Sequence, residues 1–261
     1  MKNMKKMIAM LMALTMMFAL VACGGKEEET AKKLVVGTSA DYAPFEFHKM
    51  VEGKDTILGA DIELAKKIAA DLGMELELKD ISFDVLLNEL QQGTIDVVIA
   101  GMSADEDRLK QADASDVYYD ASYQRLVILK DNADKYTGTD SFDGVKVAVQ
   151  SGTIQHDMAI ENLTGCEVVV LQSVNDVFNN LINGKVEAVL VDGVVGDQYI
   201  DTNEGLTYVD VNIATDEGTC VWVQKDDPNG YMEQINKTIA EVLENDSFTQ
   251  WLAEAEEQAA E

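Results

Sequence analysis

Short apolar runs alternate with segments of helical spacing along this chain, and that order limits the folds open to it. In the first half, residues 34–36, 74–78 and 95–100 are typical of strands; the last is apolar almost throughout, as in a strand covered on both faces. Between them, residues 61–72 and 83–92 carry apolar side chains at helical intervals, and Asp61 is expected to cap the first helix. The pattern predicts parallel strands joined by crossover helices.

The second half of the chain repeats this alternation, and one segment repeats in detail. Residues 86–101 align without a gap with residues 177–192: an asparagine, a leucine and a glycine recur, and an acid follows three residues after each glycine. We therefore expect two lobes of similar build. Ligands of open α/β sheets bind beyond the carboxyl ends of strands, so residues 101–103 and Asp192 are the first candidates for a site. The remaining expected elements are strands at 145–149, 168–171 and 186–191 and helices near 155–162 and 174–183.

The chain is strongly acidic. It carries 48 acidic and 20 basic residues, a formal net charge of -28. Such a surface repels phosphate backbones, which argues against a nucleic-acid partner. Solubility on an exposed surface is the favoured explanation, so the charge does not by itself predict a cationic ligand.

The N-terminus has the pattern of an export signal. Lys2, Lys5 and Lys6 precede an apolar run over residues 7–22, which is short for a membrane-spanning helix. The run ends in Leu20-Val21-Ala22-Cys23-Gly24, which resembles a bacterial lipobox. This resemblance implies a signal peptide over residues 1–22 and a diacylated Cys23 that anchors the protein to the extracytoplasmic face of the cell membrane, with residues 23–33 as lipidated cysteine and tether. An ordinary membrane anchor with a chance cysteine is the alternative.

Between about residues 33 and 253 the chain resembles the type II periplasmic binding proteins that serve ABC importers of polar amino acids. The resemblance depends on the order and spacing of several motifs, each of them weak alone. They are Gly37-Thr38-Ser39-Ala40-Asp41-Tyr42-Ala43-Pro44-Phe45-Glu46-Phe47, Gly59-Ala60-Asp61-Ile62-Glu63-Leu64-Ala65, Ile99-Ala100-Gly101-Met102-Ser103 with Arg108, Ser115-Asp116-Val117-Tyr118-Tyr119, Gln150-Ser151-Gly152-Thr153 and Val191-Asp192.

The resemblance implies a site for the carboxylate of a free amino acid. Arg108 would pair bidentately with the ligand α-carboxylate, since a guanidinium matches two oxygens and stays charged. Ser103 and the backbone amides of Gly101 and Thr153 would complete this site, because Thr153 lies where a predicted helix begins. A surface ion pair of Arg108 with neighbouring acids, and a simple helix cap at residues 151–153, are the alternatives.

The other end of the ligand is implied in the same way. Asp192 would bind the α-ammonium, with capping of the next helix as the alternative. Tyr42 would stack on the ligand side chain, or else be a half-buried core aromatic. Many relatives carry an aspartate where this chain has Ser39 and an aromatic where it has Ala60, which leaves the ligand's identity open. The remaining candidate contacts are Ser39, Met102 and Gln150, with Asp41 and Gln155 as further polar groups near the cleft.

The resemblance also implies discontinuous lobes. Residues 34–122 plus 214–252 would form one lobe and residues 123–213 the other, with hinge crossings near 123–126 and 211–215. A ligand that touches both lobes favours the closed form, which the importer permease would recognise. We expect a monomer that binds a free amino acid and needs no cofactor and no metal.

Two other functions compete with transport. A small-carboxylate dehydratase on the same fold would need an acid or base in the cleft. His48, expected in a solvated turn, and His156, expected in the first turn of a helix, are the only imidazoles. Cys166 and Cys220 lie beside strand-like runs and are expected to be small buried side chains. A sensory or adhesive ligand-binding module is the third interpretation.

Overall fold

The computed structural model describes residues 32–120, 123–210, 213 and 218–260. The expected signal peptide, Cys23 and most of the tether lie outside the described residues, as does most of the second expected hinge crossing. Among the described residues, no helix combines the length and apolar character needed to cross a membrane.

The first five-stranded sheet has the order β5-β1-β6-β13-β7. Strand β1 (Lys33–Thr38) pairs in parallel with β5 (Glu75–Asp80) and β6 (Val97–Val98). Strand β13 (Thr219–Gln224) pairs antiparallel with β6 and with β7 (Ala112–Tyr119). The chain thus leaves this sheet after β7 and returns to it at β13.

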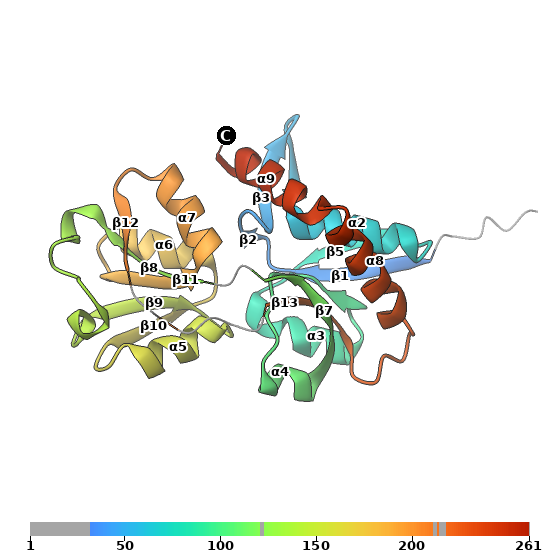
Figure 1. Ribbon diagram of the computed structural model, residues 1–261, viewed down its shortest axis with the longest axis horizontal. Helices are drawn as coiled ribbons and strands as arrows, with labels where there is room; N and C mark the ends of the chain where they lie inside the picture. The colour runs from blue at the N-terminus through green and yellow to red at the C-terminus, as the bar shows by residue number, and fades with distance from the viewer. Residues whose placement is uncertain (1–31, 121–122, 211–212, 214–217, 261) are drawn as a thin grey trace, which may run out of the picture. The chain divides into compact units, whose positions relative to one another are not determined.

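Helices cover both faces of the first sheet (Figure 1). On one face lie α2 (Ala60–Asp71), α8 (Met232–Glu244) and α9 (Ser247–Ala260), and on the other lie α3 (Leu86–Gln92) and α4 (Glu106–Gln111). Successive strand residues therefore join different cores, as Val97 does with the α2 side and Val98 with the α3 side. This explains why the strand is apolar without alternation.

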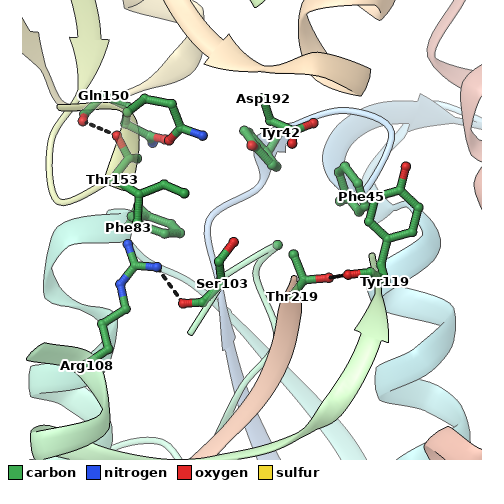
Figure 2. A pocket seen from close by; sticks show the side chains of 13 residues that line it. Tyr42, Phe45, Phe83, Ser103, Arg108, Tyr119, Gln150, Thr153, Asp192 and Thr219 are labelled. Carbon is green, nitrogen blue, oxygen red and sulfur yellow. Dashed lines mark hydrogen bonds between the residues drawn. The ribbon is translucent and has the colours of Figure 1, made fainter. Parts of the chain in front are cut away.

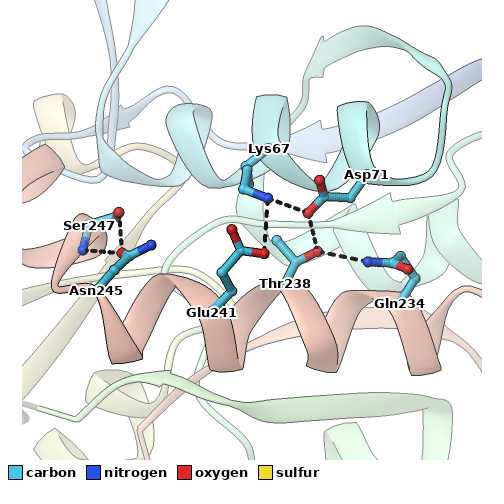
Figure 3. Close-up of polar contacts among 7 residues, drawn as sticks. All are labelled: Lys67, Asp71, Gln234, Thr238, Glu241, Asn245 and Ser247. Atoms are coloured by element: carbon cyan, nitrogen blue, oxygen red, sulfur yellow. Dashed lines mark hydrogen bonds and ion pairs between the residues drawn. The ribbon is translucent and has the colours of Figure 1, made fainter.

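Polar contacts support the packing of α2 against α8 (Figure 3). The hydroxyl of Thr238, fully buried on α8, donates to Asp71 Oδ2 at 2.7 Å. Lys67 donates to the same oxygen at 2.6 Å and approaches Glu241 Oε2 at 3.4 Å. Asp71 is thereby held by donors from both helices, which lowers its pKa, the hydrogen bond from Lys67 being the largest cause.

The second five-stranded sheet has the order β10-β9-β11-β8-β12. Strand β9 (Lys146–Gln150) pairs in parallel with β10 (Glu167–Leu171) and β11 (Ala188–Asp192). Strand β8 (Gln124–Leu129) pairs antiparallel with β11 and with β12 (Leu206–Val209). In each sheet, three parallel strands are thus followed by one antiparallel strand and then by a strand that runs in the same direction as the first three. The prediction of two similar α/β lobes with mostly parallel sheets is confirmed.

Three α-helices cover the second sheet, α5 (Ile154–Asn162) on one face and α6 (Val174–Ile182) and α7 (Gly193–Thr202) on the other (Figure 1). A small antiparallel sheet adds β2 (Asp41–Tyr42), β3 (Glu46–Val51) and β4 (Lys54–Leu58). Short 3-10 turns complete the described elements, at Phe83–Val85, Lys130–Asn132 and Thr139–Phe142.

The repeated segment has the same hydrogen bonds in both lobes. Asp96 Oδ2 accepts from the N–H of Val35 at 2.9 Å, and Glu187 Oε2 accepts from the N–H of Lys146 at 2.8 Å. In return, the Asp96 N–H donates to Val35 and the Glu187 N–H donates to Lys146, each through the backbone carbonyl. The acid that follows each repeated glycine therefore fastens the start of its strand to the neighbouring strand, which explains its place in the pattern.

Two local predictions were wrong. Helix α2 begins at Ala60 after an N-cap at Gly59, and Asp61 makes no side-chain cap but lies fully buried in the first turn. Its place follows from Gly59, which adopts φ 128° against the Phe45 carbonyl, where a side chain would not fit. His48 lies in β3 rather than in a turn, with its imidazole between Asp55 and Asp80.

Candidate ligand-binding site

One pocket lies where strands of both sheets end (Figure 2). Gln150 and Asp192 are the last residues of β9 and β11, and Gly101 follows β6. This is the position at which open α/β sheets bind ligands. The pocket is lined by Tyr42, Phe45, Phe83, Gly101, Ser103, Arg108, Tyr119, Gln150, Thr153, Ile154, Gln155, Asp192 and Thr219.

Arg108 supplies the guanidinium of the pocket. It lies on α4, buried, and its Nη1 donates to the Ser103 carbonyl at 2.7 Å while Nη2 donates to the Gly152 carbonyl at 2.9 Å. Its Nε lies 3.1 Å from Asp105 Oδ2, and the Phe83 ring lies 5.5 Å away. The ion pair with a neighbouring acid is therefore real, but the arginine is not on the surface. Its contacts with Ser103 and Gly152 join the two halves of the pocket.

A close approach of two loops allows the contact with Gly152. That residue has φ 76°, and a Cβ on it would lie 2.8 Å from the Asp84 Cα. The neighbouring Ser151 hydroxyl donates to Asp84 Oδ2 at 3.0 Å. Only glycine permits this separation in this backbone conformation.

Asp192 supplies the carboxylate of the pocket. It is buried at the end of β11 and is also the N-cap of α7, with its Oδ1 accepting from the Val194 N–H at 2.9 Å. Capping and pocket lining therefore occur together. Its charge contributes, after burial, to raising the pKa of the neighbouring Tyr119 to about 12, so that phenol stays neutral at physiological pH.

The N-terminus of α5 faces the same pocket. Thr153 is the N-cap of this helix, as predicted, and its hydroxyl donates to the Gln150 carbonyl at 2.9 Å. The first N–H groups of a helix have no acceptor within the helix and favour a nearby anion. Gln155, on the first turn, donates to Gln124 Oε1 at 3.0 Å and is fixed by that bond.

Aromatic rings form another wall of the pocket (Figure 2). Tyr42 stacks on Phe45 with ring centroids 5.7 Å apart, and Phe45 meets the edge of Tyr119 at 5.3 Å. Phe83 also lines the pocket, beside the guanidinium of Arg108. Tyr42 is thus half-buried beside Phe45, and its ring also lines the pocket; its stacking on a ligand stays a prediction.

Seven of the nine residues predicted for ligand binding line this pocket, and two do not. Ser39 lies in a neighbouring groove, and its hydroxyl donates to Asp41 Oδ1 at 3.3 Å. Met102 is buried in the core on the α3 side, and its carbonyl accepts from Trp222.

The predicted role of the Gly101 amide was wrong. Its N–H donates to Asp61 Oδ2 at 2.7 Å inside the lobe and is therefore already used. Gly101 instead lets the Tyr42 ring pack close to the backbone, since a Cβ on Gly101 would lie 2.9 Å from Tyr42 Cε1.

Several pocket residues were missed from the sequence. Tyr119 was quoted in a family motif, and strand alternation after the buried Tyr118 would have placed it in the pocket. Thr219 returns from the far end of the sequence, so only the sheet order brings it here. Phe45, Phe83 and Ile154 were also not singled out, whereas Gln155, expected as a polar group near the cleft, does line the pocket.

Among the described residues, neither the histidines His48 and His156 nor the cysteines Cys166 and Cys220 line this pocket. His48 is bonded to two aspartates, and His156 lies in the first turn of α5, as predicted, beside an outer groove. Cys220 is buried and Cys166 only partly so. Within the part of the chain that the structure describes, no group of histidine, cysteine and acidic residues could hold a metal ion.

A two-lobed α/β fold with a buried guanidinium and a buried carboxylate on one pocket is that of a solute-binding protein. The model of bacterial extracellular solute-binding proteins, family 3, matches residues 34–254. The arginine-binding extracellular protein ArtP of Bacillus subtilis is 33% identical over 250 residues, covering 93% of this chain and 94% of the relative. A probable histidine-binding protein of Campylobacter jejuni is 30% identical over 247 residues, covering 91% and 93%.

A solved structure agrees with these relatives. The amino acid ABC transporter substrate-binding protein AbpA of Streptococcus pneumoniae, bound to L-arginine, superimposes with a TM-score of 0.84 and 35% identity, covering 88% of this chain and 96% of that one. The chain belongs to family 3 of the bacterial extracellular solute-binding proteins, and it is an amino acid-binding protein of the kind that serves ABC importers.

Proposed function

We propose that this protein captures a cationic amino acid, with L-arginine as the first candidate, and presents it to an ABC importer from a lipid anchor on the extracytoplasmic face of the cell membrane. The observation that carries the proposal is the presence of Arg108 and Asp192 on one pocket, from different lobes. An α-amino acid carries one charge for each of them.

The zwitterionic end of the ligand would bind between these two groups. The Arg108 guanidinium would take the α-carboxylate, helped by the Ser103 hydroxyl and the amide end of α5. The Asp192 carboxylate would take the α-ammonium. Both side chains are buried, so each charge acts in a medium of low dielectric constant and favours a ligand that neutralises both.

The aromatic wall supports a cationic side chain. Tyr42, Phe83 and Tyr119 offer ring faces or edges, and a desolvated guanidinium against an aromatic face gains about 2 kcal/mol. The names of the relatives support arginine and, second, histidine. We expect a dissociation constant of about 1 µM, which corresponds to a binding free energy of about −8 kcal/mol.

Thermal unfolding with single amino acids tests the ligand. L-arginine at 100 times its dissociation constant should stabilise the protein by about 2.7 kcal/mol. L-histidine, L-lysine and L-glutamine are compared at equal concentration, and agmatine, which lacks the α-carboxylate, is the matched control. Stabilisation by agmatine equal to that by L-arginine would contradict the role of Arg108, and only millimolar binding of every amino acid would contradict transport.

Lipid anchoring at Cys23 is supported by the lipobox-like residues 20–24. Mass spectrometry of the purified protein should find an N-terminal diacylated Cys23. Cys23→Ala should move the protein from the membrane fraction to the soluble fraction without changing its affinity for the ligand. A Cys23→Ala protein that stays in the membrane would contradict the anchor.

We further propose that the protein is monomeric and that it carries no catalytic activity; the names of its relatives, which are binding proteins, support the second part. The lobe boundaries given above stay a prediction. Size-exclusion chromatography with light scattering tests the monomer, and incubation with small carboxylic acids, followed by product analysis, tests for turnover.

A further inference from the structure

Asp61 connects the interior of the first lobe to the ligand pocket. Its side chain is fully buried on the first turn of α2. Its Oδ2 accepts two hydrogen bonds of 2.7 Å, from the Gly101 N–H and from the Tyr118 hydroxyl. Gly101 lines the pocket with φ 55°, and the residue after Tyr118 lines it as well. One carboxylate oxygen therefore holds two segments of the pocket wall.

Glu46 lies beside Asp61 and has no donor of its own. It is fully buried at the start of β3, and neither of its oxygens has a hydrogen-bond partner among the described residues. The Asp61 Oδ1 also has none. Three buried carboxyl oxygens without a hydrogen-bond partner are costly if both groups are charged. A single proton shared by the two carboxyl groups allows a hydrogen bond between them, because the protonated group becomes a donor.

We propose that Glu46 and Asp61 form a buried carboxyl pair that holds one proton between them, and that this pair positions the Gly101 turn of the ligand pocket. The hydrogen bonds decide which partner carries the charge. Asp61 receives two donors and is the carboxylate. Glu46 receives none and keeps the proton, which it donates to Asp61. Both are positioning residues, since neither lines the pocket.

The electrostatic surroundings agree with this division. Burial raises the pKa of Asp61 to about 6, opposed by the donors Tyr118 and Gly101. Burial, followed by the charge of Asp61, raises the pKa of Glu46 well above its usual range, and the charges of Asp41 and Asp80 add to the effect. Burial also raises the pKa of the Tyr118 phenol, so that hydroxyl stays a donor.

The sign of the pH dependence follows. Groups with raised folded pKa values bind more protons in the folded state, so the stability they contribute is present at low pH and is lost as pH rises through those values. Loss of the shared proton leaves two buried carboxylates in contact. Their repulsion should loosen the hold of Asp61 on Gly101 and weaken ligand binding in alkaline solution.

Glu46→Gln is the main test, made in the full chain. The amide donates to Asp61 without a titratable proton. The variant should bind L-arginine within about twofold of the unmodified protein near neutral pH. Its melting temperature, relative to that of the unmodified protein, should rise between about pH 6 and about pH 9. Glu63→Gln on the same helix as Asp61, in an exposed pair with Lys66, is the control and should show no such trend.

Asp61→Ala and Asp61→Asn test the link to the pocket. The alanine removes the acceptor of the Gly101 N–H and should raise the dissociation constant for L-arginine about tenfold or more. The asparagine retains an acceptor oxygen and can donate to Glu46, so it should retain most of the affinity. A folded Asp61→Ala protein with unchanged affinity would overturn the positioning role.

Carboxyl ¹³C NMR measures whether Glu46 is protonated, and it does so without any ligand. The Glu46 signal should be that of a protonated acid at neutral pH and should titrate far above an ordinary glutamate. A Glu46 that is ionised at neutral pH, or a melting-temperature difference for Glu46→Gln that does not change with pH, would overturn the pair. This part of the test stands even if no amino acid binds, in which case the proposed function fails instead.

Discussion

At the scale of single residues, Arg108 shows how one side chain takes part in two structures. Its guanidinium donates to carbonyls from both lobes and is paired with Asp105. A planar group with five donors can keep these bonds while it presents others to a carboxylate. Lysine would offer one compact charge in place of this geometry.

Arg108→Lys should therefore weaken L-arginine binding by about 10- to 100-fold, because hydrogen bonds to charged groups contribute about 1.5–3 kcal/mol. Isothermal titration calorimetry measures this change. Lys110→Ala is the control, since Lys110 lies on the same helix in an exposed pair with Asp107. Equal affinity of Arg108→Lys and the unmodified protein would remove Arg108 from the carboxylate site.

At the scale of elements, the repeated helix–glycine–strand unit is the clearest feature of the fold. Gly93 and Gly184 have φ 71° and 65°, and each ends a helix before a strand of its sheet. The acids Asp96 and Glu187 then accept from the first residues of the neighbouring strands. The spacing is thus kept by the geometry of a left-handed glycine turn followed by a side chain-to-backbone bond.

Asp96→Ala should lower the free energy of unfolding by about 1 kcal/mol, since it leaves the Val35 N–H without this acceptor. Glu187→Ala should have a smaller effect, because its bond to the Lys146 N–H is exposed to water. Urea unfolding measures both. Asp96→Asn keeps an oxygen and is the matched control; an equal loss in the asparagine variant would assign the effect to charge rather than to the hydrogen bond.

At the scale of the whole molecule, hydrogen bonds join the two lobes. The Val174 N–H at the start of α6 donates to Asp41 Oδ2 at 2.6 Å, and the Ser151 hydroxyl donates to Asp84. Together with the bond from Arg108 to Gly152, these bonds hold the two lobes against each other. A ligand that adds contacts to both lobes should shift the population toward the conformation in which the lobes touch.

Gly152→Ala should disfavour closure, because its Cβ would lie 2.8 Å from the Asp84 Cα. We expect weaker L-arginine binding and a larger radius of gyration with ligand, measured by small-angle X-ray scattering. Gly144→Ala is the control: its φ of 72° gives a similar backbone strain, but no atom lies within 4 Å of the added Cβ. If both variants bind equally well, the loop contact does not govern closure.

Local pattern was enough to predict much of this protein. Apolar periodicity, glycine stops and an internal repeat determined the α/β class, the two similar lobes and most elements, because these depend on neighbours along the chain. The family motifs then singled out Arg108, Thr153 and Asp192, and the pocket includes all three. The predicted start of α2 was wrong. The helix begins after Gly59, which packs against the Phe45 carbonyl, and residue spacing in the sequence does not reveal this contact.

Only the tertiary structure decided the rest. Thr219 reaches the pocket because β13 lies between β6 and β7 in the sheet. The Gly101 N–H donates to Asp61 because α2 packs beside it. Glu46 and Asp61 appear as ordinary acids in the sequence, and burial side by side changes their chemistry. Periodicity records which face of an element is buried, but what that face meets depends on how distant segments pack.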